Sequence, residues 1–141
     1  MRVLVLDDET FVAELVKLAL EADGHLCYAA GCIEDAAEIV RRVRLDVLAL
    51  DLVRGNIDPL AWTEELVLAF PELHGRILVL TGRPLDDGER LRLNGCGATV
   101  MPKPFTLHGL REEVAKLGSA REPRSAALRA RPPESPRAED S

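Results

Sequence analysis

The chain has 141 residues, and its 18 Lys plus Arg against 24 Asp plus Glu give a formal net charge of −6 at pH 7. This length predicts one domain with a sizeable core. No apolar run reaches the ~18 residues that a membrane span needs, and an acidic chain is a poor surface for nucleic acid. The first six residues are followed at once by three acids, so we expect no secretory leader. We therefore predict a cytoplasmic protein that contacts neither membrane nor nucleic acid directly.

Five short apolar runs recur along the chain, and each is continuous rather than alternating. Continuous runs of this kind are typical of strands covered on both faces of a parallel sheet. The predicted strands are Val3–Leu6, His25–Ala30, Val47–Leu50, Ile77–Leu80 and Ala98–Met101.

A segment with helical features follows each predicted strand. The first has an apolar stripe from Val12 to Leu20 and ends near Gly24, and the second has its stripe from Ile33 to Val40. The later three are a helix opened by Asp58-Pro59 and closed near Phe70-Pro71, the charged segment Leu85–Asn94, and Leu107–Leu117 with Thr106 as N-cap. Five β-α units predict an α/β fold with a doubly wound, five-stranded parallel sheet in a three-layer αβα arrangement.

The composition changes near residue 118. Residues 1–117 carry 13 basic and 20 acidic side chains, whereas 118–141 is rich in Pro and Arg and has one large apolar residue, Leu128. Such a segment buries too little surface to offset the entropy of ordering it. We expect one folded domain over 1–117 and a disordered C-terminal tail over 118–141.

Polar side chains follow four of the five predicted strands. Asp7 and Asp8 follow the first strand, Asp51 the third, Thr81 the fourth, and Lys103 comes shortly after the fifth. In a doubly wound sheet, ligands bind outside the carboxyl ends of the strands. We therefore expect these residues to serve one site.

The residue types at this edge favour phosphoryl chemistry. Three carboxylates brought together repel one another, and a divalent cation removes that penalty. Mg²⁺ is the natural cofactor, because it takes one or two carboxylates and completes its octahedron with water and phosphate oxygens. Lys103 would add a positive charge to the same anion, and Thr81 a hydrogen bond. The set as a whole predicts a metal-assisted phosphoryl-transfer site.

Each residue also has a simpler structural interpretation. Asp7 and Asp8 could cap the first helix, where negative charge is favourable. Lys103 lies between two prolines and could be a solvated loop lysine. Only the joint arrangement carries the functional hypothesis.

With these motifs, residues 1–117 resemble the receiver domain of two-component response regulators, the CheY-like group. The resemblance rests on the acidic pair Asp7-Asp8, on Asp51, on Thr81, and on Lys103-Pro104-Phe105. It implies a flavodoxin-like sheet with strand order 2-1-3-4-5, which places the first and third strands side by side.

The resemblance also implies a role for each acidic residue. Asp51 would be the phosphoacceptor and a metal ligand, Asp8 a direct Mg²⁺ ligand, and Asp7 a ligand through water. The backbone carbonyl of Val53 would complete the protein's share of the metal shell. Lys103 would pair with the phosphoryl group.

Four further positions define the implied switch and its departures from the family. Thr81 would donate its hydroxyl to the phosphoryl group, and Gly82 beside it stands where the family most often has Ala. Pro104 is a candidate for a cis peptide bond. Val100 stands where the family usually has Tyr or Phe, so the usual coupling of the threonine to an aromatic ring cannot operate.

The leading functional hypothesis is a stand-alone response regulator. It would accept a phosphoryl group on Asp51 from a histidine kinase or phosphotransfer protein, and then change its contact with a downstream protein. It would be a monomer or a phosphorylation-linked dimer, and would catalyse only its own phosphorylation and dephosphorylation. The alternative is a receiver-fold interaction module that works without phosphorylation.

A phosphohydrolase with an Asp nucleophile is disfavoured, because the first strand is not followed by an acid-x-acid motif and no length remains for a cap domain.

Overall fold

The computed structural model describes residues 1–52 and 55–119. Strands and helices alternate along the chain, as the sequence predicts. The strands are β1 (Arg2–Leu6), β2 (Leu26–Ala30), β3 (Val47–Asp51), β4 (Ile77–Thr81) and β5 (Thr99–Pro102). The helices are α1 (Thr10–Ala22), α2 (Ile33–Arg42), α3 (Pro59–Ala69), the short 3₁₀ helix η1 (Pro71–Leu73), α4 (Asp87–Gly95) and α5 (Leu107–Ser119).

The five strands form one parallel sheet in the order β2-β1-β3-β4-β5. This confirms the predicted fold class and strand order. The register pairs Leu6 of β1 with Leu50 of β3. The next residue along the chain is an aspartate in both cases, so the topology alone brings Asp7 and Asp51 to the same edge.

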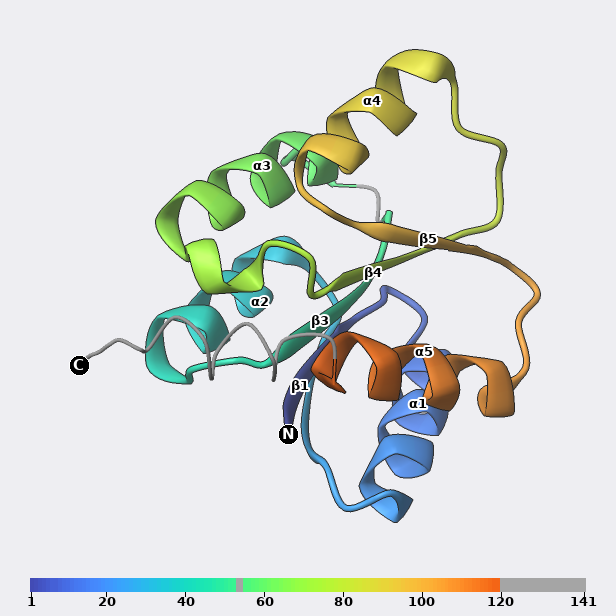
Figure 1. Ribbon diagram of the computed structural model, residues 1–141. Coiled ribbons are helices and arrows are strands. Elements are labelled where there is room, and N and C mark those ends of the chain that lie inside the picture. Colours follow the sequence, from blue (N-terminus) through green and yellow to red (C-terminus); the bar gives the residue numbers. More distant parts are fainter. Residues whose placement is uncertain (53–54, 120–141) are drawn as a thin grey trace.

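The sheet is covered on both faces (Figure 1). Because side chains alternate along a strand, Val3 and Val5 of β1 face α1 and α5, whereas Leu4 and Leu6 face α2, α3 and α4. All four are essentially inaccessible to solvent. Burying a side chain of this size contributes about 1.5–3 kcal/mol, so the continuous apolar runs stabilise two cores at once.

Local sequence signals set several helix boundaries. The Asp58 side chain accepts a hydrogen bond from the Leu60 amide at 3.0 Å, and Pro59 occupies the first helical position of α3. Thr106 accepts from the Gly109 amide at 2.9 Å at the start of α5. These caps were predicted. The capping box of Asp86 and Glu89 at the start of α4 was not.

The structure shifts some of the expected boundaries by one or two residues. β2 begins at Leu26, β5 runs one residue further than expected, and α5 continues to Ser119. Two expectations lie outside the described residues: the tail from residue 120 onward and the carbonyl of Val53. No helix within residues 1–52 and 55–119 combines the length and the hydropathy of a bilayer span.

Candidate functional site

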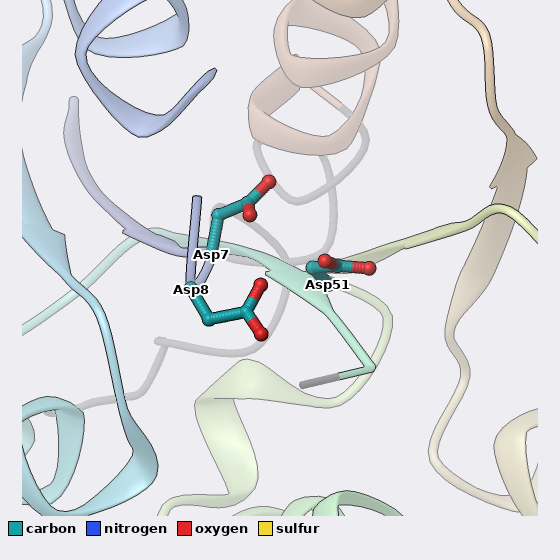
Figure 2. A group of neighbouring side chains, drawn as sticks. All are labelled: Asp7, Asp8 and Asp51. Atoms are coloured by element: carbon teal, nitrogen blue, oxygen red, sulfur yellow. The ribbon is translucent and has the colours of Figure 1, made fainter. Parts of the chain in front are cut away.

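Three aspartates meet at the carboxyl edge of the sheet (Figure 2). Asp7 and Asp8 follow β1, and Asp51 is the last residue of the neighbouring β3. One carboxylate oxygen from each of the three lies within 4.8 Å of the others. The structure therefore brings together the three acids that the sequence assigns to one site.

The three carboxylates differ in their exposure to solvent. Asp7 is 1% exposed, Asp51 is half-buried and Asp8 is exposed. Asp7 is held by its backbone, which donates to the Ala30 carbonyl at 3.0 Å, and by its Oδ1, which accepts from the Glu9 amide at 2.9 Å. Glu9 is the N-cap of α1, and its side chain makes no capping hydrogen bond. Capping of the first helix thus does not account for this acidic pair.

Lys103 reaches the acidic group from the far side of β4. Its Nζ lies 3.2 Å from Asp51 Oδ2 and 3.5 Å from Asp7 Oδ2. Its backbone amide donates to the Thr81 carbonyl at 2.7 Å, and the Lys103–Pro104 bond is cis, the isomer that the resemblance implies. With its side chain only 22% exposed, Lys103 is not a solvated loop lysine. The bridge from Lys103 to Asp7 was not predicted.

The charges of the site shift two pKa values. Burial raises the pKa of the Asp51 carboxyl, Lys103 opposes that rise, and the negative charges of Asp7 and Asp8 add to it. Burial by itself would lower the pKa of the Lys103 ammonium, but Asp51 and Asp7 outweigh it and raise that pKa. The site therefore holds more negative charge than one lysine neutralises.

The donor set fits a hard divalent cation. Carboxylate oxygens are the ligands that Mg²⁺ takes in proteins, and Asp7, Asp8 and Asp51 offer one oxygen each at close range. Burial is the main cause of the raised pKa of Asp51, and the negative charges of Asp7 and Asp8 raise it further. A cation would relieve this repulsion among the carboxylates. Asp8 and Asp51, the two more accessible acids, are suited to direct ligation.

Thr81 lies at the end of β4, next to Lys103, but its hydroxyl is turned into its own loop. Oγ1 donates to the Arg83 carbonyl at 3.0 Å and accepts from the Arg83 amide at 3.2 Å. A Cβ on Gly82 would lie 3.9 Å from the Lys103 Cβ, an ordinary contact, so the family's usual alanine would fit there. The involvement of Arg83 was not predicted, because no sequence pattern indicates which loop residue a threonine contacts.

Val100 is half-buried on β5 and borders a surface hollow of about 410 Å³ beside the site. The same hollow is lined by residues of the β4–α4 loop, of α4 and of the end of β5, namely Thr81, Gly82, Arg83, Pro84, Leu85, Arg90, Pro102 and Lys103. The short Val100 side chain thus lies next to open space between β5 and that loop.

Comparison with known proteins places this architecture in a family. No protein-family model matches the chain. The response regulator MprA of Mycobacterium leprae is 32% identical over 127 residues, which cover 90% of this chain and 55% of MprA. The probable transcriptional regulatory protein TcrX of Mycobacterium tuberculosis is 32% identical over 105 residues, covering 74% of this chain and 44% of TcrX. The chain thus spans about half the length of these curated relatives.

Solved structures agree with this assignment over nearly their whole length. A response regulator from Thermotoga maritima superposes with a TM-score of 0.72 at 28% identity, covering 84% of this chain and 97% of that chain. A CheY-like receiver domain from Methanospirillum hungatei shares the fold, with a TM-score of 0.80 at 18% identity and coverage of 87% and 97%. The beryllofluoride-activated receiver domain dimer of NtrC4 also shares it, with a TM-score of 0.75 at 21% identity and coverage of 84% and 97%. The described residues form a CheY-like receiver domain related to those of response regulators.

Proposed function

We propose that this receiver accepts a phosphoryl group on Asp51 from a phosphohistidine of a histidine kinase or phosphotransfer protein. The observation that carries the proposal is the placement of the Asp51 carboxylate, which is half-buried at the strand edge with the Lys103 ammonium 3.2 Å away. Asp7 and Asp8 flank it within reach of a shared cation. The similarity of the chain to response regulators supports this chemistry.

The proposed transfer moves one phosphoryl group from the donor histidine to the Asp51 carboxylate. The phosphorus–nitrogen bond of the donor histidine breaks, a phosphorus–oxygen bond to an Asp51 carboxylate oxygen forms, and the imidazole leaves with the electron pair. Phosphoryl transfer passes through a loose transition state with charge spread over the equatorial oxygens. The protein therefore has to position the acceptor and neutralise charge, which is a task for Lys103 beside Asp51.

The acidic residues would hold the cofactor. We assign Asp8 and Asp51 as direct Mg²⁺ ligands, Asp7 as a ligand through water, and the Val53 carbonyl as a further ligand. When bound, Mg²⁺ supplies positive charge to the transferring phosphoryl oxygens. Asp7, fixed by its contacts to Ala30 and Glu9, would orient the water without rearrangement.

Phosphorylation at this site would change the protein surface near Thr81. An acyl phosphate on Asp51 adds about two negative charges beside Thr81 and Lys103. Lys103 already faces Asp51 and would stay paired with the phosphoryl group, whereas the Thr81 hydroxyl would have to leave Arg83 to donate to it. We propose that this movement alters contact with a downstream protein, either as a monomer or through a phosphorylation-linked dimer. The protein is then a switch that catalyses only its own phosphorylation and dephosphorylation.

The absence of an aromatic ring at Val100 favours a second candidate function, that of a receiver-fold interaction module that works without phosphorylation. Beryllofluoride, a phosphoryl mimic that binds a carboxylate together with Mg²⁺, separates the two. We expect wild type to bind it with a saturable change in fluorescence of Trp62, the single tryptophan, or in amide resonances of the β4–α4 loop. Asp51→Asn should abolish binding and keep its circular dichroism spectrum. Absence of binding to a folded wild-type protein would favour the interaction module.

A further inference from the structure

The hydrogen bonds of the Thr81 hydroxyl limit when it can engage a phosphoryl group. Oγ1 accepts from the Arg83 amide at 3.2 Å and donates its proton to the Arg83 carbonyl at 3.0 Å. A hydroxyl carries a single proton. Donation to a phosphoryl oxygen on Asp51 and donation to Arg83 therefore exclude each other.

The Arg83 side chain fixes the position of that competing carbonyl. Its Nη1 and Nη2 donate to Glu89 Oε1 at 3.0 Å and Glu89 Oε2 at 2.8 Å, a two-pronged ion pair. Its Nη1 also lies 3.3 Å from the Pro84 carbonyl. The loop residue that holds the Thr81 proton is thus attached to helix α4 rather than free to move.

Glu89 is in turn hydrogen-bonded to Asp86 at the start of α4. Its Oε1 accepts from the Asp86 amide at 3.0 Å, and its own amide donates to Asp86 Oδ1 at 2.8 Å. Arg83 and the Asp86 amide lower the pKa of Glu89 to about 2, so the carboxylate stays charged at neutral pH. A chain of contacts therefore runs from the Thr81 hydroxyl through Arg83 to the first turn of α4.

We propose that Arg83 is a positioning residue that holds the Thr81 hydroxyl away from Asp51, and that its ion pair with Glu89 sets the free energy that phosphorylation must supply to release it. This inference rests on the proposed phosphoacceptor function. The Arg83–Glu89 pair joins the loop that holds the Thr81 hydroxyl directly to α4. By thermodynamic reciprocity, whatever loosens this pair favours the phosphorylated state.

Two variants test the proposal, one that removes a negative charge and one that removes a positive charge near the site. Glu89→Gln keeps an oxygen for the Asp86 amide but removes the charge that holds Arg83. Arg83→Ala removes the guanidinium, which would weaken binding of an anion if Arg83 contacted it directly. We expect both variants to bind beryllofluoride with Mg²⁺ at least about fivefold more tightly than wild type, the lower end of typical coupling between sites.

The chain offers a matched control on the same helix. Arg92 of α4 forms a comparable ion pair with Glu64, at 2.7 and 3.2 Å, and this pair joins α4 to α3 rather than to the β4–α4 loop. Glu64→Gln should lower the melting temperature as much as Glu89→Gln while leaving the affinity for beryllofluoride unchanged. An equal rise in affinity in Glu64→Gln would overturn the proposal, because general loosening of α4 would then explain the effect.

A double-mutant cycle with Thr81→Ala isolates the hydroxyl. If Arg83 acts through Thr81, adding Glu89→Gln to Thr81→Ala should no longer change the affinity for beryllofluoride. Unchanged or weaker binding in Glu89→Gln and Arg83→Ala, or a gain that persists without the Thr81 hydroxyl, would contradict the inference and leave the phosphoacceptor function standing. A wild-type protein that binds no beryllofluoride would overturn both.

Discussion

The ammonium of Lys103 lies 3.2 Å from Asp51 Oδ2, although β4 separates the two strands from which these residues come. The same Nζ is 3.5 Å from Asp7 Oδ2. Lys103 therefore reaches across the end of β4 and contacts two of the three acids. The ammonium partly neutralises the negative charge of the three aspartates, and so weakens their attraction for a cation.

Removal of Lys103 should therefore tighten metal binding. Lys103→Ala leaves Asp7, Asp8 and Asp51 uncompensated, and charges a few ångströms apart near a protein surface interact by several kcal/mol before solvent screening. We expect a rise in Mg²⁺ affinity of about fivefold or more by calorimetric titration, together with a loss of beryllofluoride binding. Lys116→Ala, which removes an exposed lysine paired with Glu113 on α5, should change neither. Unchanged or weaker Mg²⁺ binding in Lys103→Ala would count against the arrangement.

Mg²⁺ should stabilise the folded protein, because the three acids converge only in the folded state. A ligand at about 100 times its dissociation constant adds about 2.7 kcal/mol to the free energy of unfolding, so the melting temperature should rise by several degrees between chelator and excess Mg²⁺. Asp8→Asn should remove most of this rise. Glu65→Gln, at an exposed acid on α3, should keep it. The metal assignment is wrong if Asp8→Asn and wild type gain the same number of degrees.

Gly97 precedes β5 in a conformation that only glycine adopts easily. Its φ is +68°, and a Cβ there would lie 2.7 Å from the backbone nitrogen of Gly75. Gly24 has φ +91° with no atom within 4 Å of such a Cβ. A left-handed backbone costs an L-residue about 1–2 kcal/mol. We expect Gly24→Ala to lose about that amount in urea unfolding and Gly97→Ala to lose clearly more; equal losses would show that the contact with Gly75 relaxes freely.

The three cysteines should differ in reactivity and in its dependence on pH. Burial raises the pKa of the Cys27 thiol to about 11 and also raises that of Cys96, whereas Cys32 is half-buried. Alkylation requires the thiolate, and a rise of two units from 9.0 cuts its fraction about a hundredfold at pH 8. Iodoacetamide should therefore modify Cys32 first, and the Cys27 rate should still climb above pH 9. In denaturing urea all three should react alike; equal rates in the folded protein would contradict the expectation.

The sequence was sufficient for the fold and for the acidic part of the site. Continuous apolar runs such as Val47–Leu50 indicated buried parallel strands, and the polar residues that follow four of the five runs indicated the site, because the strand ends converge. Neither inference needs side-chain detail. The strand order came from the resemblance, which the acidic pair and Asp51 carried, and the observed sheet confirms it.

Side-chain partners could not be predicted in the same way. The bridge from Lys103 to Asp7 depends on the path of a flexible four-carbon chain, and the pair of Arg83 with Glu89 depends on how the β4–α4 loop folds. The sequence predicts the fourth helix over Leu85–Asn94, whereas α4 runs from Asp87 to Gly95, because Gly88 and a run of charged residues weaken its helical periodicity. The capping box of Asp86 and Glu89 compensates for that weakness.

The most direct test of the central claim is the intact mass of the protein after incubation with acetyl phosphate. With Mg²⁺, wild type should gain the mass of one phosphoryl group, and hydroxylamine, which cleaves acyl phosphates, should remove it. The gain should be absent with chelator and absent in a folded Asp51→Asn variant. A wild-type protein that stays unmodified, or an adduct that persists in Asp51→Asn, would contradict the assignment of Asp51 as phosphoacceptor.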